Sequence, residues 1–423
     1  SPFTSCDRCL LGFCFSLDRT CEPCPKGTRC LTDGSSTQET LTLTAQHWRI
    51  AGASVDIHEC PSGASSCRGG ALFADGGDSY CAEGYSGPFC EICQPDYYRD
   101  SDLNVCVECG NASGLGVTSP TLWVAVVMCV MALVAVWLFA IRRGQMSELQ
   151  AALHGISLNL AENLKPLVAF SQIVSSVSFT CEVTFPPSIS KLATFMSVLN
   201  LDLVPLLALR CSYPNFDYIS KMVAVTVAPL VVVGVISLVF LVLKLLSIGG
   251  KSLKEKTVWF LLLVSFFVLV STSSSVFEFF ACRTFPLPDG KAKHFMAADY
   301  SVSCDSRRYK SMVVFAVVMV LIYPCGIPLG CSVLLWIHRD LLHDAASMEV
   351  ESSRGFPTVG HLKFLFSNYV PSMYAFEVFE CARRLLLASV VGVAPNGTAA
   401  SPTIGLLLCL GFIFTFTELK PFK

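Results

Sequence analysis

The first 109 residues hold 13 of the chain's 22 cysteines, spaced closely enough for disulfide or metal chemistry. C-x-x-C spacing suits a tetrahedral zinc site as well as a disulfide ladder. Zinc sites favour reducing compartments and often use histidine, and only His47 and His58 lie in this region. Dense cysteine with little aliphatic content predicts disulfides in an oxidising compartment. The candidate disulfide cysteines here are Cys6, Cys9, Cys14, Cys21, Cys24, Cys30, Cys60, Cys67, Cys81, Cys90, Cys93, Cys106 and Cys109.

A second group of reactive side chains lies in the apolar part of the chain, in "AFEVFECARRLLLASVVGV". Its charged residues are Glu377, Glu380, Arg383 and Arg384, and Glu380 can pair with Arg383 or Arg384 at helical spacing. Charges inside a membrane span are costly and mark functional candidates. Three interpretations stay open: arginines that extend toward the membrane surface, a structural buried ion pair, or a gating or ion-path role.

Two apolar segments also carry polar residues. "SQIVSSVSFT" and "STSSSVFEFF" place hydroxyls along expected spans, where they commonly hydrogen-bond neighbouring helices. The alternative is a water-lined ion path, with Glu278 attracting cations near its mouth.

The stretch "VLIYPCGIPLG" places two prolines and two glycines inside an apolar run. Pro324 and Pro328 each remove a backbone donor, which bends a helix. Gly326 and Gly330 form a small-xxx-small surface that lets another helix approach closely. This pattern predicts either a packed structural bend or a hinge in a gate.

The elements that carry these residues belong to a membrane protein. The 423 residues are 53% hydrophobic and 15% charged, with a mean hydropathy of +0.58, which excludes an ordinary soluble protein and predicts contact with membrane lipid. The net charge of −2 gives no argument for nucleic acid. The first residue is serine and the number of cysteines in the first 109 residues is odd, so we expect upstream domains of a longer secretory-pathway protein.

The fold class expected is an all-α polytopic bundle of about seven transmembrane helices, preceded by a disulfide-rich, EGF-like region of small β and loop modules. Each span needs about 20 apolar residues. Segment 186–210 contains Lys191, Asp202 and Pro205, and the seven-span topology requires it to form an extracellular or re-entrant hairpin. The predicted spans are 121–141, 164–181, 222–247, 257–281, 311–337, 375–394 and 402–418.

Glycosylation sequons and cysteine pairs predict the orientation. Sequons at Asn111 and Asn396 are used only on the luminal side, and six predicted spans separate them. Disulfides are also expected between the cysteines that bracket two gaps, with both gaps outside. The cysteines of these pairs are Cys181 with Cys211, and Cys282 with Cys304. The N-terminus is then extracellular and the C-terminus cytoplasmic, in a plasma membrane or another secretory-pathway surface membrane, such as a flagellar one.

Longer patterns resemble known families. "YCAEGYSGPFCEIC" resembles laminin-type EGF-like repeats, and the run from "LTAQHWRI" to "CVECG" is similar to the juxtamembrane module of large protist surface proteins. These resemblances divide the chain into a cysteine-rich module (1–39), an EGF-like juxtamembrane module (40–118) and a multi-pass domain (119–423).

The multi-pass domain also resembles a channel family. "FEVFECARRLLLASVVGV" and the closing "TFTELKPF" resemble the fungal transient-receptor-potential-like, polycystin-related membrane proteins. That resemblance implies a cation channel, permeable to calcium or sensitive to membrane stretch. No selectivity-filter motif accompanies it.

Two function classes therefore compete. One is a TRP-like cation channel or channel-related surface sensor, which as a pore would assemble as a homo-oligomer. The other is a non-conducting adhesion receptor or anchor for an extracellular structure such as a surface filament, which needs an extracellular protein partner. No GxSxG, HExxH or P-loop motif occurs, so neither an enzyme nor a cofactor is expected.

Overall fold

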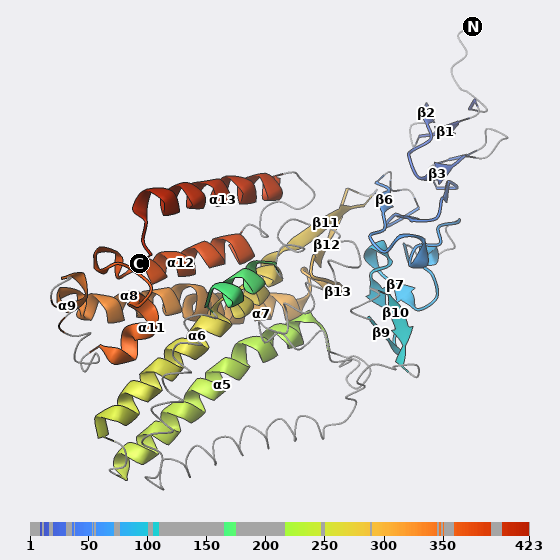
Figure 1. Ribbon diagram of the computed structural model, residues 1–423. Helices are drawn as coiled ribbons and strands as arrows, with labels where there is room; N and C mark the ends of the chain where they lie inside the picture. The colour runs from blue at the N-terminus through green and yellow to red at the C-terminus, as the bar shows by residue number, and fades with distance from the viewer. Residues whose placement is uncertain are drawn as a thin grey trace. The chain divides into compact units, whose positions relative to one another are not determined.

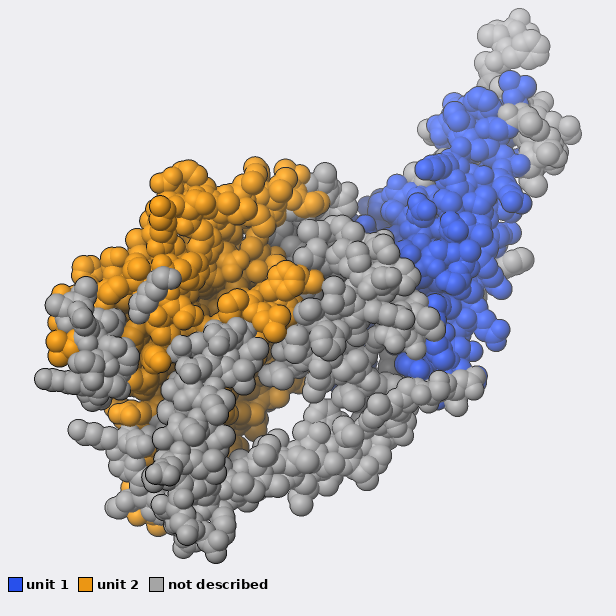
Figure 2. Space-filling model, viewed as in Figure 1, with its two compact units in different colours: residues 1–118, 204–219, 281–312 blue, residues 119–203, 220–280, 313–423 orange. Residues whose placement is uncertain are grey.

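A computed structural model describes the cysteine-rich modules and much of the helical region. The chain divides into a head unit (residues 1–118, 204–219 and 281–312) and a helical unit (residues 119–203, 220–280 and 313–423), coloured blue and orange in Figure 2. The described residues are 9–10, 12–16, 20–30, 36–37, 39–52, 54, 56–71, 77–99, 105–109, 165–174, 216–246, 250–287, 290–344, 347, 350, 359–390 and 400–422.

The head unit begins with five small antiparallel hairpins, as the cysteine pattern predicts in outline (Figure 1). Strands of two or three residues bury too little to be stable alone, so covalent links must hold them. The hairpins pair β1 (Phe13–Phe15) with β2 (Cys21–Pro23), β3 (Thr28–Arg29) with β4 (Thr42–Leu43), β5 (His47–Trp48) with β6 (His58–Glu59), β7 (Tyr85–Ser86) with β8 (Ile92–Cys93), and β9 (Tyr97–Arg99) with β10 (Cys106–Glu108).

Disulfides link these hairpins along the chain. Each described bridge closes a loop of at most 22 residues, which removes conformational freedom from the unfolded chain. The bridges join Cys9 to Cys21, Cys24 to Cys30, Cys60 to Cys67, Cys81 to Cys90, Cys93 to Cys106, and Cys282 to Cys304. Cys109 is also disulfide-bonded.

The head unit also contains a three-stranded sheet from far along the chain. Strands β11 (Cys282–Pro286), β12 (Ala292–Met296) and β13 (Asp299–Ser303) are antiparallel in the order β11–β12–β13 (Figure 1). The sequence predicted only a disulfide-bracketed loop here. Alternation along β11 directs Phe285 into the head core, where its side chain is 1% exposed.

The helical unit consists of long apolar helices and shorter amphipathic ones. Among the described residues, the α-helices are α5 (Tyr218–Leu245), α6 (Gly250–Phe280), α7 (Arg307–Val320), α8 (Ile327–Ile337), α9 (Arg339–His343), α11 (Lys363–Phe366), α12 (Phe376–Leu385) and α13 (Ala400–Leu419). Residues 165–174 are also helical. Their common core lies where α6, α8 and the segment around α11 meet.

Four helices of the described residues are long and apolar enough to cross a membrane, where seven were expected. The predicted spans 222–247, 257–281, 311–337 and 402–418 correspond to Tyr218–Leu245, Leu253–Phe280, Arg307–Ile337 and Pro402–Leu419. Two of these helices are almost entirely exposed: only 6% of the most apolar stretch of α5, and none of that of α13, is buried. Such faces are suited to lipid contact.

The other three predicted spans do not qualify within the described residues. Span 121–141, like hairpin 186–210, lies outside them, and span 164–181 is described only over 165–174. Span 375–394 corresponds to α12 and a following π-helical segment, Leu386–Val390, of 10 and 5 residues. The described part is shorter than the roughly 20 residues that a span needs, and the first nine positions of α12 hold four charges.

The proline-rich stretch forms a bend inside one continuous helical run. α7 passes into α8 through a π-helical turn, Leu321–Gly326, which contains Pro324. Pro328 is the second residue of α8, directly after that turn. π-turns and prolines are ordinary causes of helix bends, so the turn accommodates both.

Tyr323, rather than the glycines, fastens this bend to a neighbouring helix. Its side chain is 2% exposed, and its hydroxyl donates to the Thr226 carbonyl of α5 at 2.6 Å. A methyl group added at Gly330 would meet nothing within 4 Å, and one at Gly326 would meet only Leu321 of the same run, whose carbonyl oxygen would be 3.0 Å away. The expected close helix approach at the glycines is therefore not present among the described residues.

Candidate functional site

The charged residues of α12 lie on its buried face. Glu377, Glu380, Cys381 and Arg384 follow helical spacing and are each at most 9% exposed. The preceding segment positions this helix, because Phe364 and its neighbours fill the core between α6 and α8. The polar stripe of α12 is thus turned inward, opposite to the usual arrangement of an amphipathic surface helix.

Glu377 is the centre of this group. Its carboxylate lies 3.2 Å from Lys165 Nζ and 3.6 Å from an Arg384 nitrogen, and it accepts a 2.9 Å hydrogen bond from the Tyr369 hydroxyl. Glu377, Arg384 and Lys165 are only 3%, 1% and 7% exposed. A carboxylate buried this deeply needs such partners, because an unpaired charge in a low-dielectric interior is very costly.

A second ion pair adjoins the first. Arg383 donates to Glu380 Oε2 at 3.0 and 2.7 Å, so the pair at spacing i, i+3 is formed. Of the two pairings open to Glu380, the one with Arg384 is not seen between side chains, since Arg384 reaches back to Glu377 instead. We call Lys165, Glu377, Glu380, Arg383 and Arg384 the ionic cluster.

Aromatic rings surround the cations of the ionic cluster. Lys165 Nζ lies 3.7 Å from the centroid of Phe364, whose carbonyl also accepts from it, and the Arg384 guanidinium lies 4.2 Å from Phe266. Cation–π contact of this kind is strongest where water is excluded. Burial and the Glu377 carboxylate raise the pKa of Tyr369, so its phenol stays protonated and keeps donating. The arrangement holds charges in place, joining α12 to the 165–174 helix and to α11.

The sequence identified the α12 part of this cluster and missed the rest. Lys165 is the second residue of the predicted span 164–181, where nothing marks it as a partner of α12, and Tyr369 lies in the uncharged segment "SNYVPS". The one local signal is Pro166 directly after Lys165, which suits the first turn of a helix and so places Lys165 at its start.

The polar segments of the expected spans hydrogen-bond other parts of the helical unit. Gln172 donates to the Phe267 carbonyl at 3.1 Å, and Ser274 donates to the Ala388 carbonyl at 3.3 Å. Thr272 and Ser273 are also buried in α6, and Glu278 is half-buried near its end. These contacts match the interhelical role of such groups.

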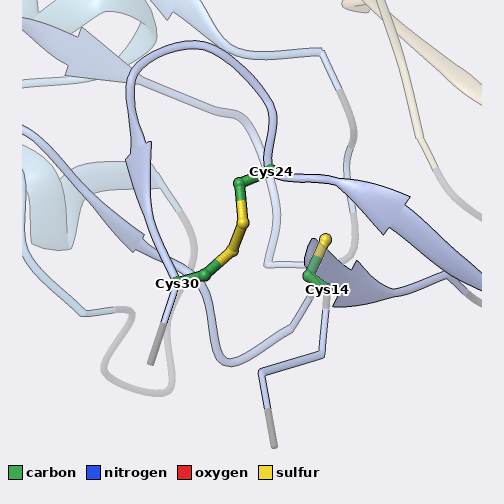
Figure 3. A group of neighbouring side chains, drawn as sticks. All are labelled: Cys14, Cys24 and Cys30. Atoms are coloured by element: carbon green, nitrogen blue, oxygen red, sulfur yellow. A yellow bond between two sulfur atoms is a disulfide. The ribbon is translucent and has the colours of Figure 1, made fainter. Parts of the chain in front are cut away.

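In the head unit, three cysteines from the first hairpins lie together. The sulfur atoms of Cys14, Cys24 and Cys30 are all within 4.8 Å of one another (Figure 3). Cys24 and Cys30 are bonded to each other, so two of the three sulfurs are unable to act as thiolate ligands for a metal. Cys14, expected to form a disulfide, is free because its neighbouring sulfurs are already paired.

Five further predicted site residues lie outside the described residues. They are Cys6, Cys181, Cys211, Asn111 and Asn396.

An aromatic cluster joins β11 to the cysteine-rich modules. The Phe285 ring lies 5.8 Å from Trp48, 5.4 Å from Phe89 and 6.0 Å from His58, measured between centroids. The Arg283 guanidinium lies 5.0 Å from the Phe89 centroid. We call these five residues the aromatic latch. Aromatic pairs in such tilted and edge-on geometries contribute about 0.5–1.5 kcal/mol each beyond their burial.

The stability of the aromatic latch should decrease in acid, because His58 becomes protonated. Burial lowers the pKa of its imidazole, the Arg283 cation lowers it further, and Asp56 opposes the shift. The unfolded imidazole titrates near pH 6.5 and the folded one lower, so the latch is fully stable above that pH and weakens as pH falls toward the folded pKa. We expect the protection of the β11 amides, taken as the intrinsic exchange rate divided by the observed rate at each pH, to fall between about pH 7.5 and about pH 5.

Two variants make this pH test specific. His58→Phe removes the titrating ring and should abolish the acid effect, whereas His294→Gln, at a half-buried position of β12 whose side chain hydrogen-bonds Thr284, should keep it. Identical pH profiles for His58→Phe and the unmodified protein would refute the assignment to His58.

The fold and these two clusters define a membrane protein with a disulfide-rich region of small β-hairpin modules. Over 199 residues, 44% of this chain, it is 25% identical to cysteine repeat modular protein A of Toxoplasma gondii. The chain covers only 6% of that protein's length. No protein-family model matches the chain, and no solved structure matches it.

Proposed function

We propose that this chain is a channel-related surface sensor, in which the disulfide-stapled head passes a stimulus to the membrane helices. The observation that carries the proposal is the position of Phe285, buried in the head core yet only five residues beyond the end of α6. One residue separates α6 from β11, and three residues separate Ser303 of β13 from the start of α7. A displacement of the head would therefore be transmitted through the sheet to both helices.

The orientation proposed places the head, the β11–β13 sheet and the start of α5 outside the cell. Its support is a set of contacts within the head unit: Arg308 pairs with Asp217 at 2.7 Å, and Asp299 accepts from the Tyr218 backbone N–H at 3.1 Å. The disulfides of the same unit require an oxidising compartment. The membrane would then be the plasma membrane or another surface membrane of the secretory pathway, with the C-terminus cytoplasmic.

In this proposal the helical unit conducts cations in the manner of the TRP-like proteins that its C-terminal pattern resembles. A head that moves relative to the membrane would shift α6 and α7, and the helical run from α7 to α8 would flex at the bend near Pro324. Symmetric assembly of several copies would supply the pore.

A non-conducting anchor is the second candidate function. The ionic cluster favours it, because charges that could line an ion path are paired with one another and with Tyr369 instead. In an anchor the same head would hold an extracellular protein partner, and the helices would need only to stay in the bilayer.

Reconstitution into planar bilayers separates the two functions. We expect cation current under membrane stretch or a calcium gradient, and a weaker response to stretch in Phe285→Ala than in the unmodified protein. The purified protein must first be shown to be folded by its intact disulfides. Absence of current under both conditions in folded protein would overturn the channel and leave the anchor.

A further inference from the structure

The three cysteines of Figure 3 place a thiol beside a disulfide. Cys14 lies in β1, Cys24 follows β2 and Cys30 follows β3, so three strands bring the sulfur atoms within 4.8 Å of one another. Cys14 is 2% exposed and unbonded, whereas Cys24 and Cys30 are half-buried. Among the described residues of the head unit, Cys14 is the one free cysteine.

A thiolate close to a disulfide is the pair of reactants that thiol–disulfide exchange needs. The thiolate attacks one sulfur of the bridge, a new bridge forms and the other sulfur leaves. Backbone hydrogen bonds hold the reactants in place here: the Cys24 N–H donates to the Gly12 carbonyl at 2.9 Å, two residues before Cys14. Proximity of this kind replaces a collision between separate molecules with a step inside one molecule.

We propose that Cys14, Cys24 and Cys30 form a thiol–disulfide exchange site whose substrates are disulfides of the oxidising compartment. In the internal step, Cys14 loses its proton and its sulfur attacks Cys24 or Cys30. The Cys24–Cys30 bond breaks, the new bond joins Cys14 to the attacked cysteine, and the departing thiolate takes up the proton. No oxidant or reductant is consumed, and the free thiol moves from a buried to a half-buried position.

The relocated thiol then reacts with an external disulfide. Its thiolate attacks one sulfur of that disulfide, forms a mixed disulfide with the head, and releases the other sulfur as a thiol. Burial raises the pKa of the Cys14 thiol, and the Glu22 carboxylate, opposite Cys14 in the β1–β2 pair, raises it further. Cys14 therefore rests protonated, which keeps the internal step slow until the hairpin opens or a partner binds.

Removing one cysteine at a time from the full chain tests the internal step. Peptide mapping after alkylation with N-ethylmaleimide should find a Cys14–Cys24 bridge in Cys30→Ser and a Cys14–Cys30 bridge in Cys24→Ser. Cys9→Ser is the matched control, because the Cys21 thiol it frees belongs to a bridge outside the triad; its Cys24–Cys30 bridge should stay intact. Two alkylated thiols in both triad variants would overturn the proposal.

Oxidised glutathione tests the external step. The unmodified protein should acquire a glutathione adduct on Cys24 or Cys30, and Cys14→Ser should lose that adduct while keeping the Cys24–Cys30 bridge. Either an equal yield of adduct in Cys14→Ser or a quantitative bridge from Cys14 to a cysteine outside the triad would refute the exchange site. These readouts do not depend on whether the helical unit conducts ions.

Discussion

Replacing Arg384 with leucine should destabilise the helical unit more than any other single change in the ionic cluster. Arg384 is 1% exposed and lies 3.6 Å from Glu377, so its loss leaves that buried carboxylate with one cation, Lys165. Removing one partner of a buried ion pair costs about 3–5 kcal/mol. We expect a large loss of folded protein in detergent, measured by thermal unfolding and by the yield of monodisperse material.

Three further variants separate the sources of this effect. Arg339→Leu is the control: Arg339 pairs with Asp340 on the surface of the same unit, with side chains 48% and 94% exposed, so its loss should cost about 1 kcal/mol or less. Arg384→Lys keeps the charge and should recover part of the stability. The triple change Lys165→Leu, Glu377→Leu and Arg384→Leu should be milder than Arg384→Leu alone, because it leaves no unpaired charge of this group in the core. Equal stability of Arg384→Leu and the unmodified protein would show that the charge is dispensable.

The long apolar helices were predictable because their signal is local. α5 was expected over 222–247 and spans Tyr218–Leu245, and the bent helix was expected over 311–337 and covers Arg307–Ile337. A run of more than 20 apolar residues has few alternatives to a membrane helix. The deviations are confined to the ends, where the apolar run and the hydrogen-bonded helix need not stop together.

The role of α12 was not predictable from the same kind of signal. Its "LLLASVVGV" suggested a span, yet the preceding charges decide how it packs, and their partner Lys165 is 212 residues away. Nothing in the local pattern distinguishes a lysine that meets Glu377 from one that faces water. The pairing of Arg384 with Glu377 instead of Glu380 likewise depends on what α6 and the 165–174 helix place opposite α12.

The sequence predicted that the head consists of small disulfide-bonded modules, but not which cysteines are bonded to each other. Cysteine density indicated small stapled modules, whereas the number of ways to pair the cysteines is too large for spacing to choose among them. The β11–β13 sheet was missed because its strands are short and mixed in polarity, such as "CRTFP" and "AKHFM". Its fold depends on Trp48 and Phe89, about 200 residues earlier, which supply the apolar surface that Phe285 needs.

Phe285→Ala is expected to loosen the packing of the β11–β13 sheet on the cysteine-rich modules of the head unit. The ring is 1% exposed and contacts three aromatic neighbours of the latch, and truncating a buried phenylalanine costs about 3–5 kcal/mol. The Cys282–Cys304 bridge remains and keeps the sheet's ends together. The loss should therefore appear as faster amide exchange in β11 and around Trp48, with the disulfides unchanged.

A control in the next strand makes this result interpretable. Phe295 of β12 is half-buried, with its ring 5.9 Å from Phe285, so Phe295→Ala removes a ring of equal size from the rim of the same core. It should raise exchange less than Phe285→Ala, because a partly exposed ring gives up less burial when truncated. If the two variants exchange alike, Phe285 does not fasten the sheet. If the cysteine-rich modules stay packed on the sheet in Phe285→Ala, then Phe285 is not the link through which the head is proposed to act on the helices.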